Sequence, residues 1–275
     1  MLDEAVRLQQ EGRFSDASAL YRHCFEAYPD LRPRGADFLI IGAGKSGTGW
    51  MRKCLSRHEG VRILSGEHNY FSRHTDLSPV DYSALFKPEN FKGGHKATDG
   101  YIQGEKSPSY QIMSSARIEL CAALYPKAKI ILLVRGPVDR AWSNLKMVGF
   151  PEGGEAYERI VRIGHYERDV RRWLEHFADI HIVDFDEICT APDRVMDAVH
   201  AFLGVEPLAY RNVQEFTVLA EPKRADMPDE MRRVLEDIYR GERWDVPWLR
   251  SIVADAAKAR AKPARTPAEA ATVAS

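Results

Sequence analysis

The sequence predicts an α/β fold in three layers, with a mainly parallel sheet, a phosphate loop like that of P-loop NTPases and an N-terminal helical hairpin. Three observations predict this class. Short apolar runs at 38–41, 129–134 and 180–185 are typical of strands buried on both faces. Apolar residues at helical spacing fill the segments between them, and this alternation favours a parallel sheet. A glycine-rich turn at 42–49 follows the first run directly, at the position where open α/β sheets bind ligands.

The segment before the first strand has the apolar spacing of two helices. Residues 2–28 repeat small and aromatic side chains at helical intervals, and the pattern breaks at Gly12. The spacing is similar to one tetratricopeptide-type unit, so residues 1–34 are assigned to a helical hairpin. A single unit of this kind cannot bury its apolar face alone. We therefore expect it to pack on the main domain; the alternative is a surface that docks a partner protein.

The main domain is predicted to span residues 36–250. Beyond the three strands, a weaker strand is expected at 61–64, and helices are expected at 50–57, 115–124, 138–147, 164–177 and 192–203. Pro137 suits the first turn of a helix, and Gly204 suits a helix end. Residues 255–275 are rich in alanine, proline and basic residues without a sustained apolar face, which predicts a disordered tail.

The charge balance excludes binding by bulk electrostatics. The chain of 275 residues has 39 Lys and Arg against 40 Asp and Glu, a formal net charge of -1. Proteins that bind nucleic acid by general attraction have a basic excess, so no nucleic acid is expected and any anion must meet a local cluster. The apolar runs are too short to span a membrane. The four cysteines are far apart, so we expect no metal site, no disulfide framework and a cytoplasmic location.

The glycine-rich turn at 42–49 presents backbone N–H groups and a helix N-terminus, which together bind anions. A Walker A loop does not fit, because Leu39 occupies the position five residues before Gly44 where that loop needs a glycine. A second interpretation is a phosphate loop with the pattern Lys-x-Gly-Thr, carried by Lys45 to Thr48. A glycine turn that binds no ligand is the structural alternative.

The same turn also satisfies the dinucleotide-binding pattern Gly-x-Gly-x-x-Gly. Gly42, Gly44 and Gly47 have the required spacing, and Glu67 follows within the range where such folds place an acidic residue. The pattern is weak evidence on its own, and Lys45 is unusual in a turn built for close backbone approach. An NAD-linked oxidoreductase therefore stays open as an alternative at this point.

A second cluster suited to an anion follows the strongest predicted strand. Arg135 comes directly after the apolar run at 129–134, and Ser143 lies about two turns into the next helix. Arginine binds phosphate in a forked geometry, and a serine hydroxyl adds a donor. Because parallel strands end at one edge of the sheet, this cluster and the glycine-rich turn predict a ligand with two separated phosphate groups.

Four motifs, in order along the chain, resemble those of the sulfotransferases that use 3′-phosphoadenosine 5′-phosphosulfate (PAPS). Residues 45–48 (Lys-Ser-Gly-Thr) match the family's 5′-phosphosulfate loop, and residues 135–143 match its 3′-phosphate motif. Residues 66–71 and 105–110 are similar to segments of the heparan sulfate N- and 3-O-sulfotransferase branch, a carbohydrate-sulfating branch. The region from Tyr166 to Phe202 also resembles that branch.

The resemblance extends from about Asp37 to Trp248 and implies roles for individual residues. The residues implied to bind the donor are Lys45, Ser46, Gly47, Thr48, Gly49, Arg135, Ser143, Lys223 and Arg224. The residues implied in catalysis are Lys45, Glu67 as general base, and Lys106 beside the acceptor or the transferred group. His68 is the alternative base. The structural alternatives are a Glu67 that is merely paired with a cation and a Lys106 that is exposed before a turn proline.

The function implied is transfer of a sulfuryl group from PAPS to a hydroxyl or amine by in-line displacement, without a metal and with 3′-phosphoadenosine 5′-phosphate (PAP) as product. The acceptor is expected to be a small molecule or a glycan. A carbohydrate is the first candidate; a lipid or polyketide hydroxyl and a protein tyrosine are alternatives. Asn69 stands where the branch often has histidine, and the chain lacks a basic excess, so the acceptor stays open. A non-catalytic nucleotide-binding module is a further alternative.

Overall fold

The computed structural model describes residues 1–87, 90–91, 100–149, 154–208 and 227–261. The helices and strands follow one another as α1 (Leu2–Gln10), α2 (Phe14–Ala27), β1 (Phe38–Gly42), α3 (Thr48–Leu55), β2 (Val61–Ile63), α4 (Tyr70–Arg73), α5 (Pro79–Ser83), β3 (Ile102–Lys106), α6 (Ser115–Leu124), β4 (Lys129–Val134), α7 (Pro137–Val148), α8 (Gly154–Arg162), α9 (Tyr166–Leu174), β5 (Ile180–Asp184), α10 (Phe185–Thr190), α11 (Pro192–Leu203), α12 (Asp229–Ile238) and α13 (Val246–Ala261). Short helical turns add η1 (Pro29–Leu31), η2 (Ala84–Phe86) and η4 (Pro108–Ile112). Among these described elements, no helix has the length and apolar character needed to cross a bilayer.

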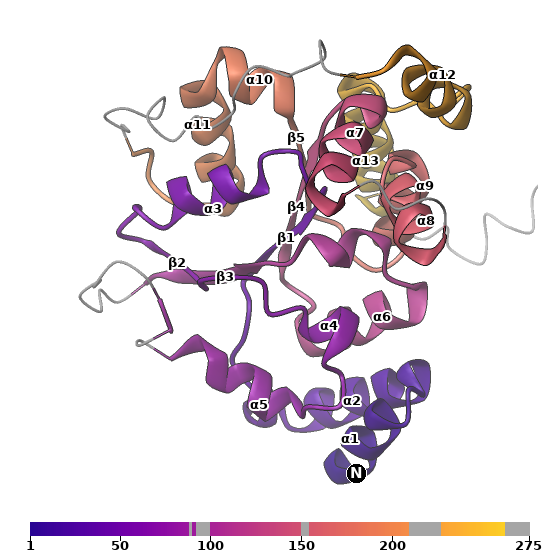
Figure 1. Ribbon diagram of the computed structural model, residues 1–275. Coiled ribbons are helices and arrows are strands. Elements are labelled where there is room, and N and C mark those ends of the chain that lie inside the picture. Colours follow the sequence, from indigo (N-terminus) through magenta and orange to yellow (C-terminus); the bar gives the residue numbers. More distant parts are fainter. Residues whose placement is uncertain (88–89, 92–99, 150–153, 209–226, 262–275) are drawn as a thin grey trace, which may run out of the picture.

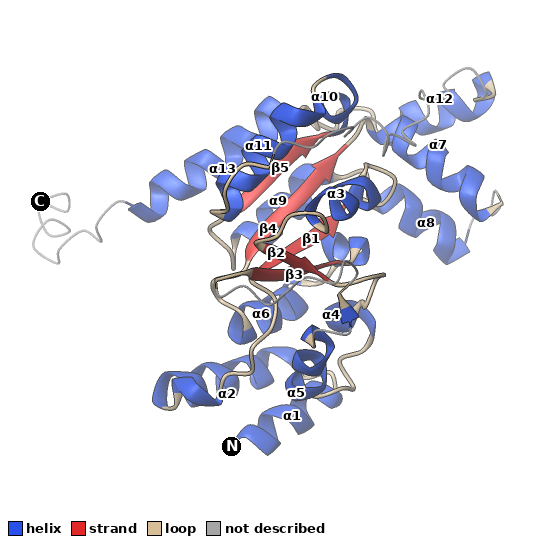
Figure 2. Cartoon of the chain, turned by 90° about the vertical axis from the view of Figure 1, so that its left-hand side faces the viewer, coloured by secondary structure: helices blue, strands red, loops and turns tan. Residues whose placement is uncertain are grey.

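The described strands form one parallel sheet in the order β2-β3-β1-β4-β5 (Figures 1 and 2). β1 lies inside the sheet, where Phe38 is in register with Gly104 of β3 on one side and with Lys129 of β4 on the other. The chain leaves β1 for β2, returns to β3 and then crosses to β4, so the strand order reverses beside β1. Open α/β sheets bind ligands at such a switch point, outside the carboxyl ends of the strands.

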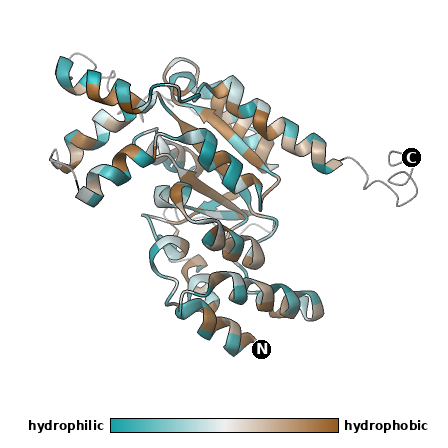
Figure 3. Ribbon diagram, turned by 90° about the vertical axis from the view of Figure 1, so that its right-hand side faces the viewer, coloured by the Kyte–Doolittle hydropathy of each residue, from teal (hydrophilic) through white to brown (hydrophobic). Residues whose placement is uncertain are grey.

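Helices cover both faces of the sheet, which confirms the predicted three-layer α/β class. Side chains alternate along β1, so Leu39 and Ile41 join one apolar cluster while Phe38 and Ile40 join the other. The first cluster includes residues of α6, α9 and α13, and the second includes residues of α3 and α11. A smaller cluster joins α7, α8 and α12. In Figure 3 the strands are mostly brown and the outward helix faces largely teal, as expected for a sheet buried between two helical layers.

β3 completes the sheet, although the sequence analysis predicts no strand there. Its residues, Ile-Gln-Gly-Glu-Lys, contain no apolar run, yet the last four are buried. Gly104 allows close packing, because a Cβ at this position would lie 2.5 Å from the carbonyl oxygen of Phe38. The buried amide of Gln103 donates to the carbonyl oxygen of Gly35 at 2.7 Å. The strand therefore satisfies its polar side chains internally, and this cannot be read from hydrophobic pattern alone.

The N-terminal hairpin packs on the rest of the chain. α1 and α2 contact each other, and α2 lies against α6 (Figure 2). The side chain of Gln9 is fully buried and donates to the carbonyl oxygens of Thr75 at 2.9 Å and Leu77 at 2.7 Å. Arg22 forms a salt bridge with Glu119 of α6 at 2.6 Å. These contacts give the hairpin a structural role, and docking of a partner protein through it stays a prediction.

α13 extends further along the chain than the sequence indicates. The first part of the predicted tail at 255–275 is helical, because α13 continues to Ala261. The guanidinium of Arg260 donates to the carbonyl oxygens of Phe177, at 3.0 Å, and Leu174, so it satisfies backbone groups at the end of α9. This contact with α9 fixes the last turn of α13. The rest of the predicted tail, residues 262–275, lies outside the described residues.

Candidate active site

The glycine-rich turn connects the carboxyl end of β1 to the N-terminus of α3. It needs glycine at two points: a Cβ on Gly42 would lie 2.8 Å from Oε1 of Gln111, and Gly47 has a φ of 91° as the N-cap of α3. The backbone N–H groups of Gly47, Thr48 and Gly49 have no acceptor within the described residues. The turn therefore presents unpaired donors and the positive end of a helix, an arrangement that binds phosphate.

Lys45, in the middle of this turn, lines a cavity of about 580 Å³ at the carboxyl edge of the sheet. Its backbone has a φ of 71°, in the left-handed region that residues other than glycine seldom adopt. Burial lowers the pKa of the Lys45 ammonium, and the nearby cations Arg135 and Lys146 lower it further. Positive charges are thus gathered here at an electrostatic cost that a bound anion would offset.

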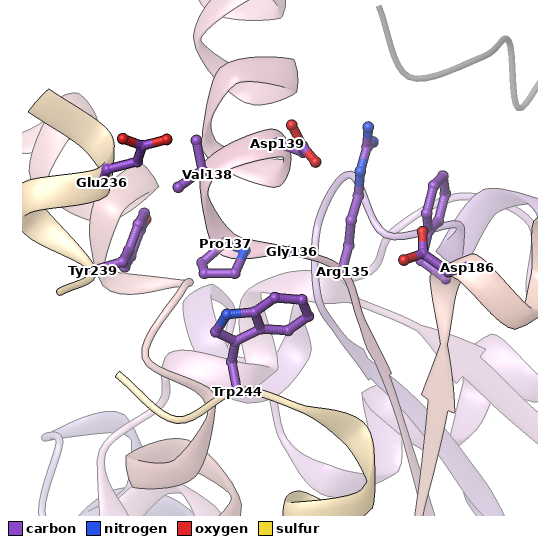
Figure 4. A pocket seen from close by; sticks show the side chains of 10 residues that line it. Arg135, Gly136, Pro137, Val138, Asp139, Asp186, Glu236, Tyr239 and Trp244 are labelled. Carbon is purple, nitrogen blue, oxygen red and sulfur yellow. The ribbon is translucent and has the colours of Figure 1, made fainter. Parts of the chain in front are cut away.

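Arg135 follows β4, and the structure brings it to the glycine-rich turn. Its Nη1 donates to the carbonyl oxygen of Lys45 at 3.1 Å, and its guanidinium lies 4.4 Å from the centre of the Phe185 ring. Burial lowers the pKa of Arg135, while the Asp139 carboxylate opposes that shift. Arg135 also lines a smaller cavity of about 270 Å³, where Figure 4 shows its side chain flanked by Asp139 and Asp186. The two predicted anion clusters are therefore adjacent.

Ser143, the other residue predicted for the second cluster, lies on α7 and is half-buried. It lines neither cavity and has no hydrogen bond within the described part of the chain. Its neighbour Asn144 does line the larger cavity. Lys223 and Arg224 lie outside the described residues. The structure thus joins Arg135 to the turn, whereas donor binding by Ser143, Lys223 and Arg224 stays a prediction.

Glu67 and Lys106, predicted as catalytic residues, contact each other. Nζ of Lys106 lies 2.5 Å from Oε1 of Glu67, and both side chains line the larger cavity together with Lys45. The Lys106 side chain is 10% exposed and the Glu67 side chain 47%, so an acceptor can reach the carboxylate. His68, the alternative base, does not line the cavity, and its Nε2 is buried without a hydrogen bond to any described residue. Of the two residues predicted as the base, Glu67 lines the cavity and His68 does not, and the role itself stays a prediction.

A buried carboxylate lies beside this pair. Glu105 is fully buried, and its two oxygens accept hydrogen bonds from the hydroxyls of Tyr82 at 2.8 Å, Tyr110 at 2.6 Å and Ser107 at 3.0 Å. Burial raises the pKa of Glu105, and the three hydroxyl donors oppose that shift. The sequence identifies the motif that contains Glu105, but it does not reveal that this carboxylate accepts hydrogen bonds from three hydroxyl groups.

The hydroxyl groups around Glu105 also hold the segment that carries Glu67. The Ser107 hydroxyl accepts a hydrogen bond from the backbone N–H of Asn69 at 3.0 Å, and the Tyr110 hydroxyl accepts one from the N–H of Phe71 at 3.3 Å. Each hydroxyl thus donates to a buried carboxylate and accepts from the backbone. The position of Glu67 relative to Lys106 is set by this network.

Two further cations in the larger cavity were not found from the sequence. Arg73 of α4 and Arg159 of α8 line it together with Glu67 and Lys106. Arg73 follows Glu67 closely in the chain, so its proximity could have been inferred. α8 is distant in sequence, and its pattern of charged and apolar residues is typical of any amphipathic surface helix. Only the tertiary structure brings Arg159 to this site.

The donor groups around the cavity suit an anion rather than a cation. They are backbone N–H groups, two ammonium groups and guanidinium groups, which bind phosphate and sulfate oxygens. The described residues contain no group of three or more His, Cys, Asp or Glu side chains that could hold a metal ion. The positive charge of these side chains complements the negative charge of a nucleotide that has a 5′-phosphosulfate and a 3′-phosphate.

The fold and the site define an α/β protein with an anion-binding loop after an inner strand and a cationic cavity at the sheet edge. A family model described as "Sulfotransferase domain" matches residues 35–227, which is more than half of the chain. The chain therefore belongs to the sulfotransferase family, as its motifs predicted.

Relatives and solved structures agree with this family. Heparan sulfate glucosamine 3-O-sulfotransferase 6 of Mus musculus is 30% identical over 193 residues, covering 64% of this chain and 54% of that protein. Bifunctional heparan sulfate N-deacetylase/N-sulfotransferase 3 of Mus musculus is 30% identical over 200 residues, covering 62% of this chain and 22% of that protein. The chain thus spans about half the length of the first relative and less of the second. A sulfotransferase from Alicyclobacillus acidocaldarius shares the fold with a TM-score of 0.61 and 22% identity, covering 80% of this chain and 96% of that chain.

Proposed function

We propose that this protein transfers a sulfuryl group from PAPS to a hydroxyl or amine acceptor, with PAP as the other product. One observation carries the proposal: Lys45, Glu67 and Lys106 line a single cavity, and the last two are in contact. A loop lysine that meets the donor and a carboxylate that meets the acceptor are the two groups an in-line transfer requires. That Lys45 and Glu67 line one cavity at the carboxyl edge of the sheet supports this proposal.

In this proposal the donor is held by its two phosphate groups. Lys45 and the N–H groups from Ser46 to Gly49 bind the 5′-phosphate; Arg135 binds the 3′-phosphate with Ser143, Lys223 and Arg224. Lys45 also stabilises the negative charge that develops on the phosphate oxygen as its bond to sulfur breaks. The hydrogen bond from Arg135 to the Lys45 carbonyl fixes the spacing between these two binding groups.

At the other end of the cavity, Glu67 removes the proton of the acceptor hydroxyl or amine while the new bond to sulfur forms. Lys106 holds the Glu67 carboxylate in place and presents its ammonium to the oxygens of the transferred group. The sulfuryl group passes from phosphate oxygen to acceptor oxygen or nitrogen, and the proton passes to Glu67. No group is oxidised or reduced.

We propose a carbohydrate as the first candidate acceptor, because the two relatives described above are named for heparan sulfate. A lipid or polyketide hydroxyl and a protein tyrosine are the alternatives. A non-catalytic nucleotide-binding module and an NAD-linked oxidoreductase are less well supported, since neither gives the Glu67–Lys106 contact a function.

We further propose that residues 36–250 form the catalytic domain with the hairpin 1–34 packed on it. The four free cysteines fit a reducing compartment, which supports a cytoplasmic location.

Two measurements test the donor and the reaction separately. Calorimetry with PAP and with NAD identifies the nucleotide, and the expected result is binding of PAP alone. Transfer of labelled sulfate from PAPS to sugars, hydroxylated lipids and tyrosine peptides then identifies the acceptor class. Absence of PAP binding would overturn the proposed function, whereas PAP binding without turnover of any acceptor would favour the non-catalytic alternative.

Glu67→Gln tests the base. Because glutamine is nearly isosteric but cannot accept the proton at neutral pH, we expect loss of sulfate transfer with nearly unchanged PAP affinity. The matched control is Glu59→Gln, at an exposed position that lines neither cavity, which should retain full activity. Full turnover by Glu67→Gln would show that another group removes the proton.

A further inference from the structure

The backbone of Arg135 lies one residue beyond the sheet. The pairing of β4 with β5 ends where Val134 is in register with Asp184, and Arg135 follows directly. Neither the N–H nor the carbonyl group of Arg135 has a backbone partner among the residues that the structure describes. Backbone groups away from bulk water need a hydrogen-bond partner, so a side chain has to supply one at this point.

The hydroxyl of Tyr166 serves both groups. It donates to the carbonyl oxygen of Arg135 at 2.9 Å and accepts a longer hydrogen bond from the Arg135 N–H at 3.4 Å. A phenol hydroxyl has one hydrogen to donate and lone pairs that accept, so one side chain can take both roles. Tyr166 is fully buried, so bulk water does not compete for its hydroxyl.

Tyr166 is the first residue of α9, and buried contacts fix this helix to η4. Oδ2 of the fully buried Asp169 accepts a hydrogen bond from the amide of Gln111 at 2.9 Å. The same amide donates to the carbonyl oxygen of Ile163, just after α8, at 2.8 Å. Nε1 of the buried Trp173 donates to the carbonyl oxygen of Gln111 at 3.2 Å. The Tyr166 hydroxyl therefore extends from a helix whose position is set by the protein interior.

The side chain of Arg135 is held by different contacts. Its Nη1 donates to the carbonyl oxygen of Lys45, and its guanidinium lies over the ring of Phe185. These contacts orient the guanidinium, whereas the hydroxyl of Tyr166 fixes the peptide groups from which the side chain extends. A shift of the backbone would move the whole side chain, and a forked contact with a phosphate depends on its exact position.

We propose that Tyr166 is a positioning residue that fixes Arg135 for the 3′-phosphate of the donor, and that it thereby sets how strongly the site prefers a nucleotide with that phosphate. This role rests on the proposed function, in which Arg135 binds the 3′-phosphate. Tyr166 lines neither of the two cavities, so it acts through Arg135 rather than by touching the nucleotide.

The test compares PAP with adenosine 5′-phosphate (AMP), which differs from PAP only in lacking the 3′-phosphate. Calorimetry measures both affinities in the wild type and in Tyr166→Phe, which loses only the hydroxyl. PAP should bind the variant roughly three- to tenfold more weakly, the effect of about one lost hydrogen bond, and AMP affinity should be unchanged. No weakening of PAP binding, or equal weakening for both nucleotides, would overturn the proposal.

Tyr21→Phe is the matched control. Tyr21 is also buried, and its hydroxyl donates to Oε1 of Gln9 at 3.1 Å in the N-terminal hairpin. Chemical denaturation should show that both variants lose some stability and remain folded, whereas only Tyr166→Phe should lower the ratio of PAP affinity to AMP affinity. An equal change of this ratio in Tyr21→Phe would reflect a general loss of stability and would overturn the positioning role.

A double-mutant cycle tests whether Tyr166 acts through Arg135. Arg135→Gln should remove most of the preference for PAP over AMP, and adding Tyr166→Phe should then cause no further loss. Independent, additive losses would overturn the proposal. A wild type that does not bind PAP would overturn the proposed function and this role with it. A wild type that prefers PAP, with the same preference in Tyr166→Phe, would overturn the positioning role alone.

Discussion

Lys45 combines an unusual backbone conformation with contacts to the cavity and to Arg135. It occupies a left-handed backbone position, lines the larger cavity, and offers its carbonyl oxygen to Arg135. The sequence identified it through the Lys-x-Gly-Thr pattern, since loop lysines that bind phosphate are recognisable from local spacing. The contact with Arg135 joins residues far apart in the chain, so it could not be predicted from either motif alone.

Replacing Lys45 tests the donor site at the scale of one residue. In Lys45→Ala we expect PAP to bind roughly ten- to hundredfold more weakly, because a charge-assisted contact to phosphate is lost, and sulfate transfer to disappear. Calorimetry and the labelled-sulfate assay measure the two effects. Lys53→Ala, an exposed lysine on the same helix α3 that follows the turn, is the control. Unchanged PAP affinity in Lys45→Ala would place the 5′-phosphate elsewhere.

The pKa of Lys45 predicts a pH dependence. Burial and neighbouring cations lower this pKa in the free protein, and a bound phosphate raises it again, so binding is coupled to protonation. PAP affinity should be full below the lowered pKa and should fall as the pH rises through it, before an ordinary lysine would lose its proton. Calorimetry from neutral to alkaline pH measures the decline. Lys45→Arg, which stays protonated, should abolish it; an identical decline in that variant would contradict the assignment.

At the scale of elements, β3 and η4 hold Glu67 and Lys106, the two residues proposed to act in catalysis. β3 ends with Glu105 and Lys106, and η4 begins two residues later. The same short stretch positions Glu67 through the Ser107 and Tyr110 hydroxyls and anchors α4 and α8. One connection therefore links Glu67, Lys106 and the two helices that carry Arg73 and Arg159.

Two tyrosine variants separate positioning from stability. The Tyr110 hydroxyl bonds both Glu105 and the backbone N–H of Phe71, whereas the Tyr82 hydroxyl bonds only Glu105 among these groups. Each replacement by phenylalanine should cost about 1–2 kcal/mol of unfolding free energy, because a buried hydrogen bond is lost. Only Tyr110→Phe should also reduce kcat and shift the pH profile of transfer, with PAP affinity unchanged. Equal kinetic effects in both variants would make the network merely structural.

The elements that could be predicted are those whose burial is visible as apolar sequence. β4 is Lys-Ile-Ile-Leu-Leu-Val and was predicted with its observed bounds, 129–134. β3 was not predicted, because Gln103 and Glu105 are buried with hydrogen-bond partners that come from distant parts of the chain. Arg159 is not predicted either, because only the tertiary structure brings α8 to the larger cavity. The local sequence pattern identifies the core of the sheet and the glycine-rich turn, whereas the grouping of Glu67 with Arg159 depends on tertiary contacts.

For the whole molecule, the hairpin is part of the stable fold rather than an appendage. Gln9 is fully buried and its amide satisfies the carbonyl oxygens of Thr75 and Leu77. In Gln9→Leu the Thr75 carbonyl loses this donor, while the Leu77 carbonyl keeps its hydrogen bond from the Tyr70 hydroxyl at 3.2 Å, so we expect the unfolding free energy to fall by about 2 kcal/mol. Chemical denaturation measures the change. Gln10→Leu, whose exposed amide contacts only the carbonyl oxygen of Asp76, is the control and should cost much less.

The net charge of -1 describes the whole molecule, whereas binding of an anion depends on the charges around the two cavities. Lys45, Arg73 and Arg159 line the larger cavity and Arg135 the smaller one, although acidic side chains such as Glu67, Asp139 and Asp186 line the same two cavities. The expectation that any anion must meet a local cluster is consistent with this arrangement. That Arg73 and Arg159 also line the larger cavity could be seen only in the structure.

The position of β1 inside the sheet has a consequence for how the chain folds during synthesis. β1 leaves the ribosome long before its partners, since Phe38 must pair with Gly104 of β3 and with Lys129 of β4. Neither partner forms a local hairpin with it, and such distant pairings are slow because a long loop must close first. The run Phe-Leu-Ile-Ile therefore stays unpaired until most of the sheet has been translated. During that interval the nascent chain exposes the same apolar strand that later positions the phosphate loop, and an exposed, unpaired apolar strand is prone to aggregate.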